Sequence, residues 1–170
     1  IFGDGAGAVI ISASEDDRGV LQTKLRTDGS LAGIVGQYIG GTKEWYSEEA
    51  IREERLVLEM DGKAVWDCAT RELPAVMHEV VEAGGYKMED VDFVVAHQAN
   101  KKLLTHVMEL SGIPLNKTFT NIERYGNTVA ASAIIALDEF VRQEDLHRGD
   151  QEVMVAIGAG MIWGAHLMRW

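Results

Sequence analysis

The sequence predicts an α/β domain in which helices pack on one layered mixed sheet, with the elements in a βαβαββ-type order. Two observations support this fold class. Amphipathic stretches with helical spacing alternate with short, nearly all-apolar stretches, as in a mostly parallel buried sheet. The chain then closes with two apolar runs separated by glycines, which favours an antiparallel hairpin at one edge. A length of 170 residues with 46% hydrophobic residues is enough for a core.

The first stretch, Gly-Asp-Gly-Ala-Gly-Ala at residues 3–8, fits the dinucleotide-binding pattern G-x-G-x-x-[GA]. That motif needs a strand before it and a helix after it, whereas here a strand-like apolar run follows. We therefore interpret it as a tight turn into a buried strand at residues 8–13, with residues 20–27 as the hairpin partner. Because the chain begins Ile-Phe-Gly without a methionine, we expect it to be part of a longer protein.

The middle of the chain contains one long loop and one long helix. Residues 28–48 are rich in glycine and aromatic residues without a clear period, which indicates a loop, and residues 56–60 alternate weakly. Asp61 is a suitable N-cap for a helix that runs to about Ala83, where two glycines end it. Pro74 lies inside this helix and predicts a kink or a break.

The remaining elements are shorter and alternate regularly. We expect strands at residues 91–96, 118–122, 151–157 and 162–170, and helices at residues 101–110 and 128–142. The run at residues 153–168 is interrupted by glycines and a histidine and is short for a membrane helix, so a strand, a turn and a strand are the better interpretation.

Charge and cysteine content disfavour several function classes. The net charge of −11 disfavours nucleic-acid binding, which needs a basic footprint. The single cysteine, Cys68, excludes an internal disulfide, fits a reducing compartment and is expected to be a buried, inert thiol. No cysteine or histidine cluster has zinc spacing, and the run at residues 78–82 begins like a metalloprotease helix but ends in glutamate. We expect no metal.

The first candidate site residue is His97, which ends a buried strand just before a helix. Open α/β sheets place their sites at the carboxyl ends of strands. The positive end of the following helix favours a neutral imidazole, which can donate a hydrogen bond to a carbonyl. The alternative to a catalytic role is that His97 is an ordinary structural histidine. We assign structural roles to the other four histidines: His78, His106, His147 and His166.

The second candidate, Asn127, has the same setting, after a short strand and before a helix. A helix N-cap is the alternative. If adjacent parallel strands bring the two ends together, an imidazole N–H and an amide N–H converge, and such a pair can hold an oxyanion or an enolate. The glycine-rich stretch at residues 157–165 is either a tight corner or the source of a backbone N–H donor at the same edge.

Taken together, four stretches resemble, in order and spacing, the carboxy-terminal half of β-ketoacyl-[acyl carrier protein] synthase III, a condensing enzyme with a thiolase-like fold. They are GDGAGA (3–8), AHQAN (96–100), RYGNTVAAS (124–132) with ALDE (136–139), and WGAHLMRW (163–170). The resemblance is weakest at residues 29–60. It implies that residues 1–19 end the amino-terminal half and that residues 20–170 form the carboxy-terminal thiolase-like domain.

The resemblance also implies roles for individual residues. His97 and Asn127 would be the catalytic pair that binds the thioester carbonyl of malonyl-carrier protein and stabilises the enolate as carbon dioxide leaves. Asn100 would help hold the coenzyme A arm. Lys101 and Lys102 would dock the acidic acyl carrier protein, and local potential allows this on an acidic chain. Gly158, Ala159 and Gly160 would form the oxyanion loop.

Two departures from the family pattern bear on the activity. The family's nucleophilic cysteine lies in the amino-terminal half and Cys68 does not match its motif, so we expect this chain to be inactive alone. The oxyanion loop carries Ala159 where the family usually has a glycine, and the added Cβ favours a shifted loop. The second departure favours an alternative, a thiolase-fold acyltransferase of secondary metabolism.

The resemblance implies a 3-oxoacyl-[acyl carrier protein] synthase III of fatty acid biosynthesis, which performs a decarboxylative condensation. Acyl-CoA and malonyl-carrier protein would be its substrates, without a cofactor. The expected partners are the acyl carrier protein, the missing amino-terminal half and, in the full-length protein, a second copy in a homodimer. We expect a cytoplasmic location and no interaction with nucleic acid or a membrane. A non-catalytic half-domain that binds the carrier protein is a further alternative.

Overall fold

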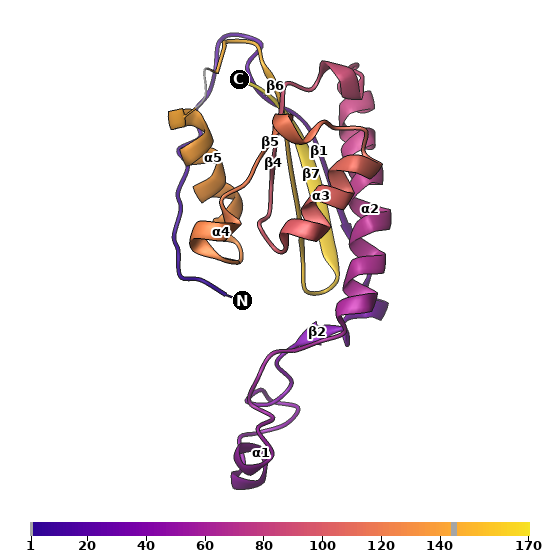
Figure 1. Ribbon diagram of the computed structural model, residues 1–170, viewed down its shortest axis with the longest axis vertical. Helices are drawn as coiled ribbons and strands as arrows, with labels where there is room; N and C mark the ends of the chain where they lie inside the picture. The colour runs from indigo at the N-terminus through magenta and orange to yellow at the C-terminus, as the bar shows by residue number, and fades with distance from the viewer. Residues whose placement is uncertain (1, 144–145) are drawn as a thin grey trace.

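A five-stranded mixed sheet separates two layers of helices in the computed structural model, which describes residues 2–143 and 146–170 (Figure 1). Helices α2 and α3 cover one face of the sheet, and α5 covers the other. This arrangement confirms the predicted α/β class. The elements of this body are β1 (Gly19–Thr27), α2 (Gly62–Ala83), β4 (Phe93–Ala96), α3 (Lys101–Leu110), β5 (Thr118–Phe119), α4 (Ile122–Tyr125), α5 (Ala131–Gln143), β6 (Gln151–Gly158) and β7 (Ile162–Arg169).

The strand order is β1-β7-β6-β4-β5. Strand β4 is parallel to both β5 and β6, whereas β7 is antiparallel to β6 and to β1. Strands β6 and β7 form the predicted closing hairpin, which is therefore confirmed. Strand β1 pairs with β7 as a further antiparallel strand and forms the edge of the sheet. Along the chain the order β1-α2-β4-α3-β5-α5-β6-β7 adds one βα unit to the expected pattern. Three short 3₁₀ helices complete the connections: η1 (Gly29–Leu31), η2 (Met88–Asp90) and η3 (Leu115–Lys117).

Helix α2 begins and ends where its capping residues predict. The Asp61 side chain accepts a hydrogen bond from the Ala64 N–H (2.9 Å), and Gly85 takes the left-handed backbone (φ +82°) just after the helix. The helix continues through Pro74, so the predicted break does not occur. Residues on both sides of the proline are buried in the main core, and this packing outweighs the lost backbone hydrogen bond.

Two apolar clusters, one on each face of the sheet, form the core. The larger lies between the sheet and helices α2 and α3. The smaller lies under α5, where the Phe93 and Phe140 rings pack with their centroids 4.6 Å apart. Strand β4 is buried on both faces, as its continuous apolar sequence predicts. A rigid central strand therefore leads directly to His97.

The amino-terminal segment differs from the prediction. Residues 8–13 form no strand in the described part of the chain, and Ile10 is 98% exposed. The expected hairpin is wrong because β1 pairs with β7 instead. The glycines of residues 3–8 do not form a tight turn either. They allow a close approach, since a Cβ on Gly3 would collide with the Tyr125 carbonyl and one on Gly5 would press on Ile135.

An arm that contains β2 (Val35–Gly36), α1 (Glu48–Arg52) and β3 (Glu59–Met60) projects from one end of the body (Figure 1). The predicted long loop and the weakly alternating residues 56–60 lie in this arm. Strands β2 and β3 pair with each other, and Trp45 is 75% exposed on the arm.

Two predicted elements are shorter in the structure. Strand β5 ends at Phe119, and the residues expected to continue it lead into the turn of α4. Helix α5 begins at Ala131, three residues later than predicted, because the backbone at Val129 has a positive φ that no α-helix accommodates. The residues between β5 and α5 are therefore a loop, and this loop carries Asn127.

Candidate active site

The carboxyl ends of three parallel strands meet at one edge of the sheet. His97 follows β4, and its N–H donates to the Val155 carbonyl of β6 (2.9 Å). The chain after β5 passes through α4 to Asn127. Gly158 is the last residue of β6, and Ala159 and Gly160 lie in the turn that follows it. All three predicted parts of the site therefore lie at the edge where α/β sheets place their ligands.

The His97 ring is partly buried and is held by α5. Its Nδ1 lies 2.6 Å from the Ser132 hydroxyl oxygen in the first turn of that helix. Burial lowers the pKa of His97, and a backbone hydrogen bond with Val129 opposes this shift more weakly. The net lowering favours the neutral imidazole at pH 7, and its cause is burial rather than the neighbouring helix named in the prediction.

The Asn127 side chain has a fixed orientation. Its Oδ1 accepts a hydrogen bond from the Val129 N–H (2.9 Å), so the amide nitrogen Nδ2 is left as a donor. Its backbone carbonyl accepts from the Gly3 N–H (2.9 Å), which attaches the amino-terminal segment to the site. Because α5 begins only at Ala131, Asn127 is not its N-cap, and the bond to Val129 is a local turn.

Val129 joins the two candidate residues. Its N–H donates to Asn127, and its carbonyl accepts from the Ser132 hydroxyl (2.8 Å), which lies 2.6 Å from Nδ1 of His97. Val129 has φ +52°, which is rare and costly for a β-branched residue. Such strain persists where the surroundings over-determine the backbone, and it concentrates at functional sites. The structure thus links Asn127 to His97 through Val129 and Ser132.

Asn100 and the two lysines lie at the start of α3. The Asn100 Oδ1 accepts from the backbone N–H groups of Lys102 (2.9 Å) and Leu103 (3.2 Å), so this residue caps the helix. Lys101 forms an ion pair with Glu123 of α4, whereas the exposed Lys102 has no ion pair among the described residues. The side-chain amide nitrogen of Asn100 is left as a donor on the surface beside His97.

The glycine loop forms the turn between β6 and β7. Gly160 has φ +145°, and the peptide bond between Gly160 and Met161 is cis. The buried Met161 exchanges two backbone hydrogen bonds with Asp28 (2.9 and 3.0 Å), which fixes the loop against the chain after β1. A narrow cavity of about 20 Å³, roughly the space of one water, lies between α3 and the end of β6. His97, Asn100 and Ile157 are among the residues that line it.

Two site residues, Gln98 and Ser132, were missed from the sequence. Gln98 is 1% exposed, and its side chain ties β4 to the chain after β5: Nε2 donates to the carbonyls of Ala96 and Phe119, and Oε1 accepts from the Asn121 N–H. Ser132 is 2% exposed and contacts His97. A buried amide directly after a buried strand was the available signal for Gln98. For Ser132, the sequence offers no signal beyond its place in the 124–132 motif.

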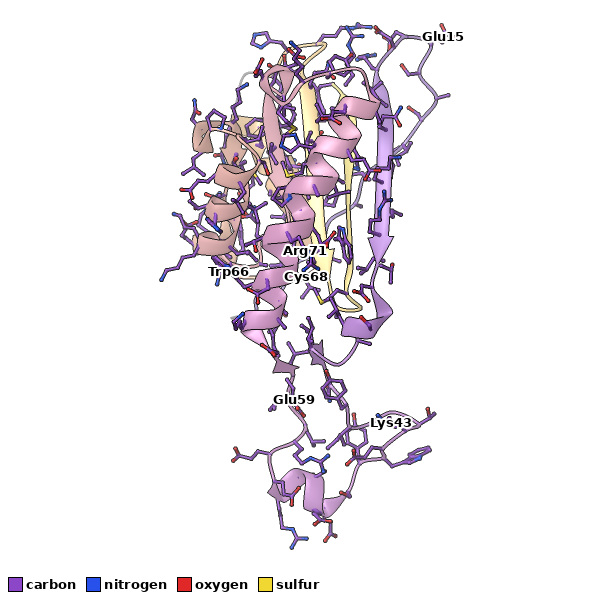
Figure 2. All side chains as sticks on the ribbon, turned by 90° about the vertical axis from the view of Figure 1, so that its right-hand side faces the viewer. Glu15, Lys43, Glu59, Trp66, Cys68 and Arg71 are labelled. Atoms are coloured by element: carbon purple, nitrogen blue, oxygen red, sulfur yellow. The ribbon has the colours of Figure 1, made fainter. Side chains whose placement is uncertain are left out.

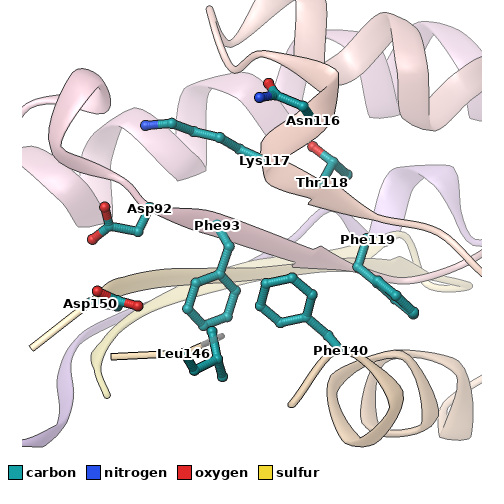
Figure 3. A pocket seen from close by; sticks show the side chains of 9 residues that line it. All are labelled: Asp92, Phe93, Asn116, Lys117, Thr118, Phe119, Phe140, Leu146 and Asp150. Carbon is teal, nitrogen blue, oxygen red and sulfur yellow. The ribbon is translucent and has the colours of Figure 1, made fainter. Parts of the chain in front are cut away.

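A larger hollow of about 310 Å³ lies near the amino end of β4 (Figure 3). Its apolar wall includes Phe93, Phe119 and Phe140. Two of its charged side chains already serve the fold: Asp92 accepts from the Gln151 N–H (2.8 Å), and Lys117 donates to the Val91 carbonyl. This hollow is therefore a less suitable candidate than the edge with His97.

Cys68 lies in α2 (Figure 2), where burial raises the pKa of its thiol. This environment disfavours the reactive thiolate. Among the described residues there is no group of three or more histidine, cysteine, aspartate or glutamate residues that could hold a metal ion. No helix in the described part of the chain is long and apolar enough to cross a membrane.

Comparison with known proteins gives consistent matches. A family model described as 3-oxoacyl-[acyl-carrier-protein (ACP)] synthase III C terminal matches residues 81–170, and another, described as 3-oxoacyl-[acyl-carrier-protein (ACP)] synthase III, matches residues 1–29. The chain is 36% identical over 170 residues to the β-ketoacyl-[acyl-carrier-protein] synthase III of Roseiflexus castenholzii. The match covers 100% of this chain and 52% of that protein.

The corresponding protein of Aquifex aeolicus is 38% identical over 171 residues, which cover 100% of this chain and 50% of the relative. The crystal structure of the synthase III from the same organism superposes with a TM-score of 0.79 at 34% identity. That match covers 94% of this chain and 47% of the crystallised one. The chain thus spans about half the length of the curated relatives it matches.

Proposed function

The chain belongs to the 3-oxoacyl-[acyl-carrier-protein] synthase III family, and on this premise we propose that it supplies the decarboxylation site of a condensing enzyme. In the proposed reaction an acyl-thioester and malonyl-carrier protein give β-ketoacyl-carrier protein, carbon dioxide and the free thiol of the acyl donor. Acyl-CoA would be the priming substrate, in fatty acid biosynthesis. The observation that carries the proposal is the chain of contacts through Val129 and Ser132 that links the catalytic pair His97 and Asn127.

The proposed chemistry follows from this pair. Loss of carbon dioxide leaves an electron pair that the thioester carbonyl takes up as an enolate. Asn127 offers Nδ2 as a donor because its oxygen is already occupied, and a preorganised donor stabilises the developing negative charge. His97 presents its ring nitrogen Nε2 to the same site, and the contact between its Nδ1 and Ser132 of α5 holds the ring in place. The enolate carbon then attacks the acyl group carried by the enzyme's cysteine, and the carbon–sulfur bond breaks to release the cysteine thiolate.

The remaining assignments extend this proposal. The nucleophilic cysteine would lie outside the residues of this chain, since burial raises the thiol pKa of Cys68. Asn100 would hold the coenzyme A arm, and Gly158, Ala159 and Gly160 would supply the oxyanion loop. Lys102, whose charge is unpaired among the described residues, would dock the acidic carrier protein with help from Lys101. The whole protein would act in the cytoplasm without a cofactor.

The proposed domain organisation assigns residues 1–19 to an amino-terminal half and residues 20–170 to the carboxy-terminal domain. The exposed segment that contains Ile10 supports this division, because it contacts α4 and α5 and its apolar side chains need a further partner. In the full-length protein that partner would be the other half, and two copies would form a homodimer.

Replacing Asn127 by alanine in the full-length natural protein tests the function. We expect carbon dioxide release from malonyl-carrier protein to fall roughly a hundredfold or more, as when one oxyanion donor is lost. Transfer of a labelled acyl group to the enzyme should remain nearly unchanged, because loading depends on the thiolate.

The two assays also separate the alternatives. If acyl loading falls together with decarboxylation, Asn127 has a structural role in the site. If the unmutated protein releases no carbon dioxide, the acyltransferase of secondary metabolism becomes the better assignment, and the Ala159 substitution is the feature that favours it. If the protein neither takes up the acyl group nor releases carbon dioxide, the remaining assignment is a non-catalytic half-domain that binds the carrier protein.

A further inference from the structure

The Ser132 hydroxyl has three neighbours that together determine its hydrogen bonds. The Gln98 N–H donates to its oxygen (3.1 Å), and the hydroxyl donates to the Val129 carbonyl (2.8 Å). A serine hydroxyl has one hydrogen to donate. Once that hydrogen is used on Val129, the third neighbour, Nδ1 of His97 at 2.6 Å, can bind the hydroxyl oxygen only as a donor.

The Val129 carbonyl fixes the direction of the serine hydroxyl. A carbonyl oxygen only accepts, so the bond between Ser132 and Val129 (2.8 Å) uses the serine hydrogen, and the hydroxyl presents its oxygen to Nδ1 of His97. We propose that Ser132 is a positioning residue that holds His97 in the Nδ1–H tautomer and leaves Nε2 with its lone pair for the reaction. This inference rests on the proposed function of the site.

The tautomer changes what His97 contributes. In the neutral ring, Nε2 is an acceptor and does not donate to a carbonyl until the ring takes up a proton. Asn127 is then the side-chain donor that meets the enolate from the start, and His97 becomes a second donor only as an imidazolium. The expectation from the sequence was that the neutral imidazole donates.

The position of Ser132 suits this role. It is 2% exposed in the first turn of α5, and its bond to Gln98 connects it to β4. Three elements of the site therefore converge on one hydroxyl: the end of β4, the Val129 peptide and α5. Alanine at this position would keep the helix and remove the acceptor for Nδ1–H.

The direct test is nitrogen NMR of the His97 ring in the full-length natural protein, with Ser132→Ala, Ser132→Thr and Ser111→Ala as variants. Nitrogen resonances distinguish a protonated Nδ1 from a protonated Nε2. We expect unmutated protein at pH 8 to show Nδ1–H alone, and Ser132→Ala to show a mixture of tautomers. Ser132→Thr keeps the hydroxyl and should keep the single tautomer.

Ser111 is the matched control because it is a buried serine at the C-cap of α3 (1% exposed) whose hydroxyl donates to the Val107 carbonyl. Ser111→Ala should leave the tautomer and the rate unchanged. In Ser132→Ala, carbon dioxide release should fall on the order of tenfold or more, since a histidine in the wrong tautomer loses most of its function. Ser132→Thr should restore the rate.

An Nε2–H tautomer in the unmutated protein, or an unchanged tautomer in Ser132→Ala, would overturn the proposal. A loss of rate in Ser132→Ala with no change of tautomer does the same, because it shows a structural role. The NMR result does not depend on turnover. If the expected tautomers appear in a protein that releases no carbon dioxide, the inference about Ser132 stands and the proposed function fails.

Discussion

Glu152 is fully buried in β6, on the face of the sheet that packs against α5, opposite Phe93 of β4 and Met168 of β7. Neither of its carboxyl oxygens has a hydrogen-bond partner among the described residues. Burial raises its pKa from 4.5 to about 7. His166, two residues from Met168 on the same face, is also ionisable, and burial lowers its pKa.

The folded protein therefore holds the Glu152 proton to a higher pH than the unfolded chain does. Well below pH 4.5 the carboxyl is neutral in both states, so its ionisation does not affect the stability. Between pH 4.5 and about 7 the unfolded state releases the proton first, so folding loses stability as the pH rises. The full penalty at pH 8 is about 3 kcal/mol.

We predict that Glu152→Gln has little effect on the free energy of unfolding at pH 5 and raises it by about 2 to 3 kcal/mol at pH 8. Urea unfolding of both proteins at the two pH values measures this. The His166 contribution is common to both proteins and cancels in the difference. Glu82→Gln, at an exposed position near the end of α2, is the control and should have the same effect at both pH values. Equal effects of Glu152→Gln at both pH values would contradict the prediction.

The sequence correctly placed His97 at the end of a strand, because a short apolar run is a local pattern, whereas Asn127 lies in a loop after α4 and not directly after a strand. The sequence could not indicate Val129 or Ser132. The positive φ of Val129 runs against its own preference, and the bond from His97 to Ser132 joins residues 35 positions apart. Contacts of this kind depend on the packing of α5 against β4, which no local pattern encodes.

At the scale of elements, Asn100 at the start of α3 has both a structural role and a proposed role in ligand binding. Its Oδ1 caps the helix, and its amide nitrogen is the proposed donor to the coenzyme A arm. The two roles use different atoms of one side chain. Asn100→Asp keeps the capping acceptor and places a negative charge at the helix N-terminus, which is favourable there, but removes the donor. Asn100→Ala removes both.

We therefore predict that Asn100→Ala lowers the free energy of unfolding by about 1 kcal/mol whereas Asn100→Asp leaves it nearly unchanged. Both variants should raise the KM for the acyl-CoA substrate in the full-length natural protein. Urea unfolding and initial-rate kinetics on the same preparations give both quantities. A normal KM in the aspartate variant would show that Asn100 serves only as a helix cap.

Helices were predicted more accurately than strands. The helices at residues 61–83 and 101–110 follow from their caps and apolar spacing, and both were found within a residue or two. The strand expected at residues 8–13 and the partner assigned to β1 were wrong. A strand depends on its neighbour for its hydrogen bonds, and the apolar run at residues 8–13 has none in the described part of the chain. Apolar sequence alone could not show this.

At the scale of the whole molecule, the exposed apolar residues are not scattered. Val9, Ile10 and Ile11 are 55%, 98% and 86% exposed and are consecutive in one extended segment that runs beside α5 (Figure 1). Their backbone is unpaired in the described residues. An extended segment with free backbone groups and apolar side chains is a template for pairing with another chain.

We predict that residues 1–170, produced on their own, self-associate through this segment. Light scattering after size-exclusion chromatography should give a mass above that of one chain, and a dye that fluoresces on apolar surfaces should bind. The double variant Ile10→Lys with Ile11→Lys should return the protein to a monomer, because charges on an unpaired edge oppose pairing. Leu115→Lys replaces an apolar residue that is 50% exposed elsewhere on the surface, and it should leave the association intact. A monomer that binds no dye would show that the segment folds back on the body in solution, and equal effects of the two substitutions would place the association elsewhere.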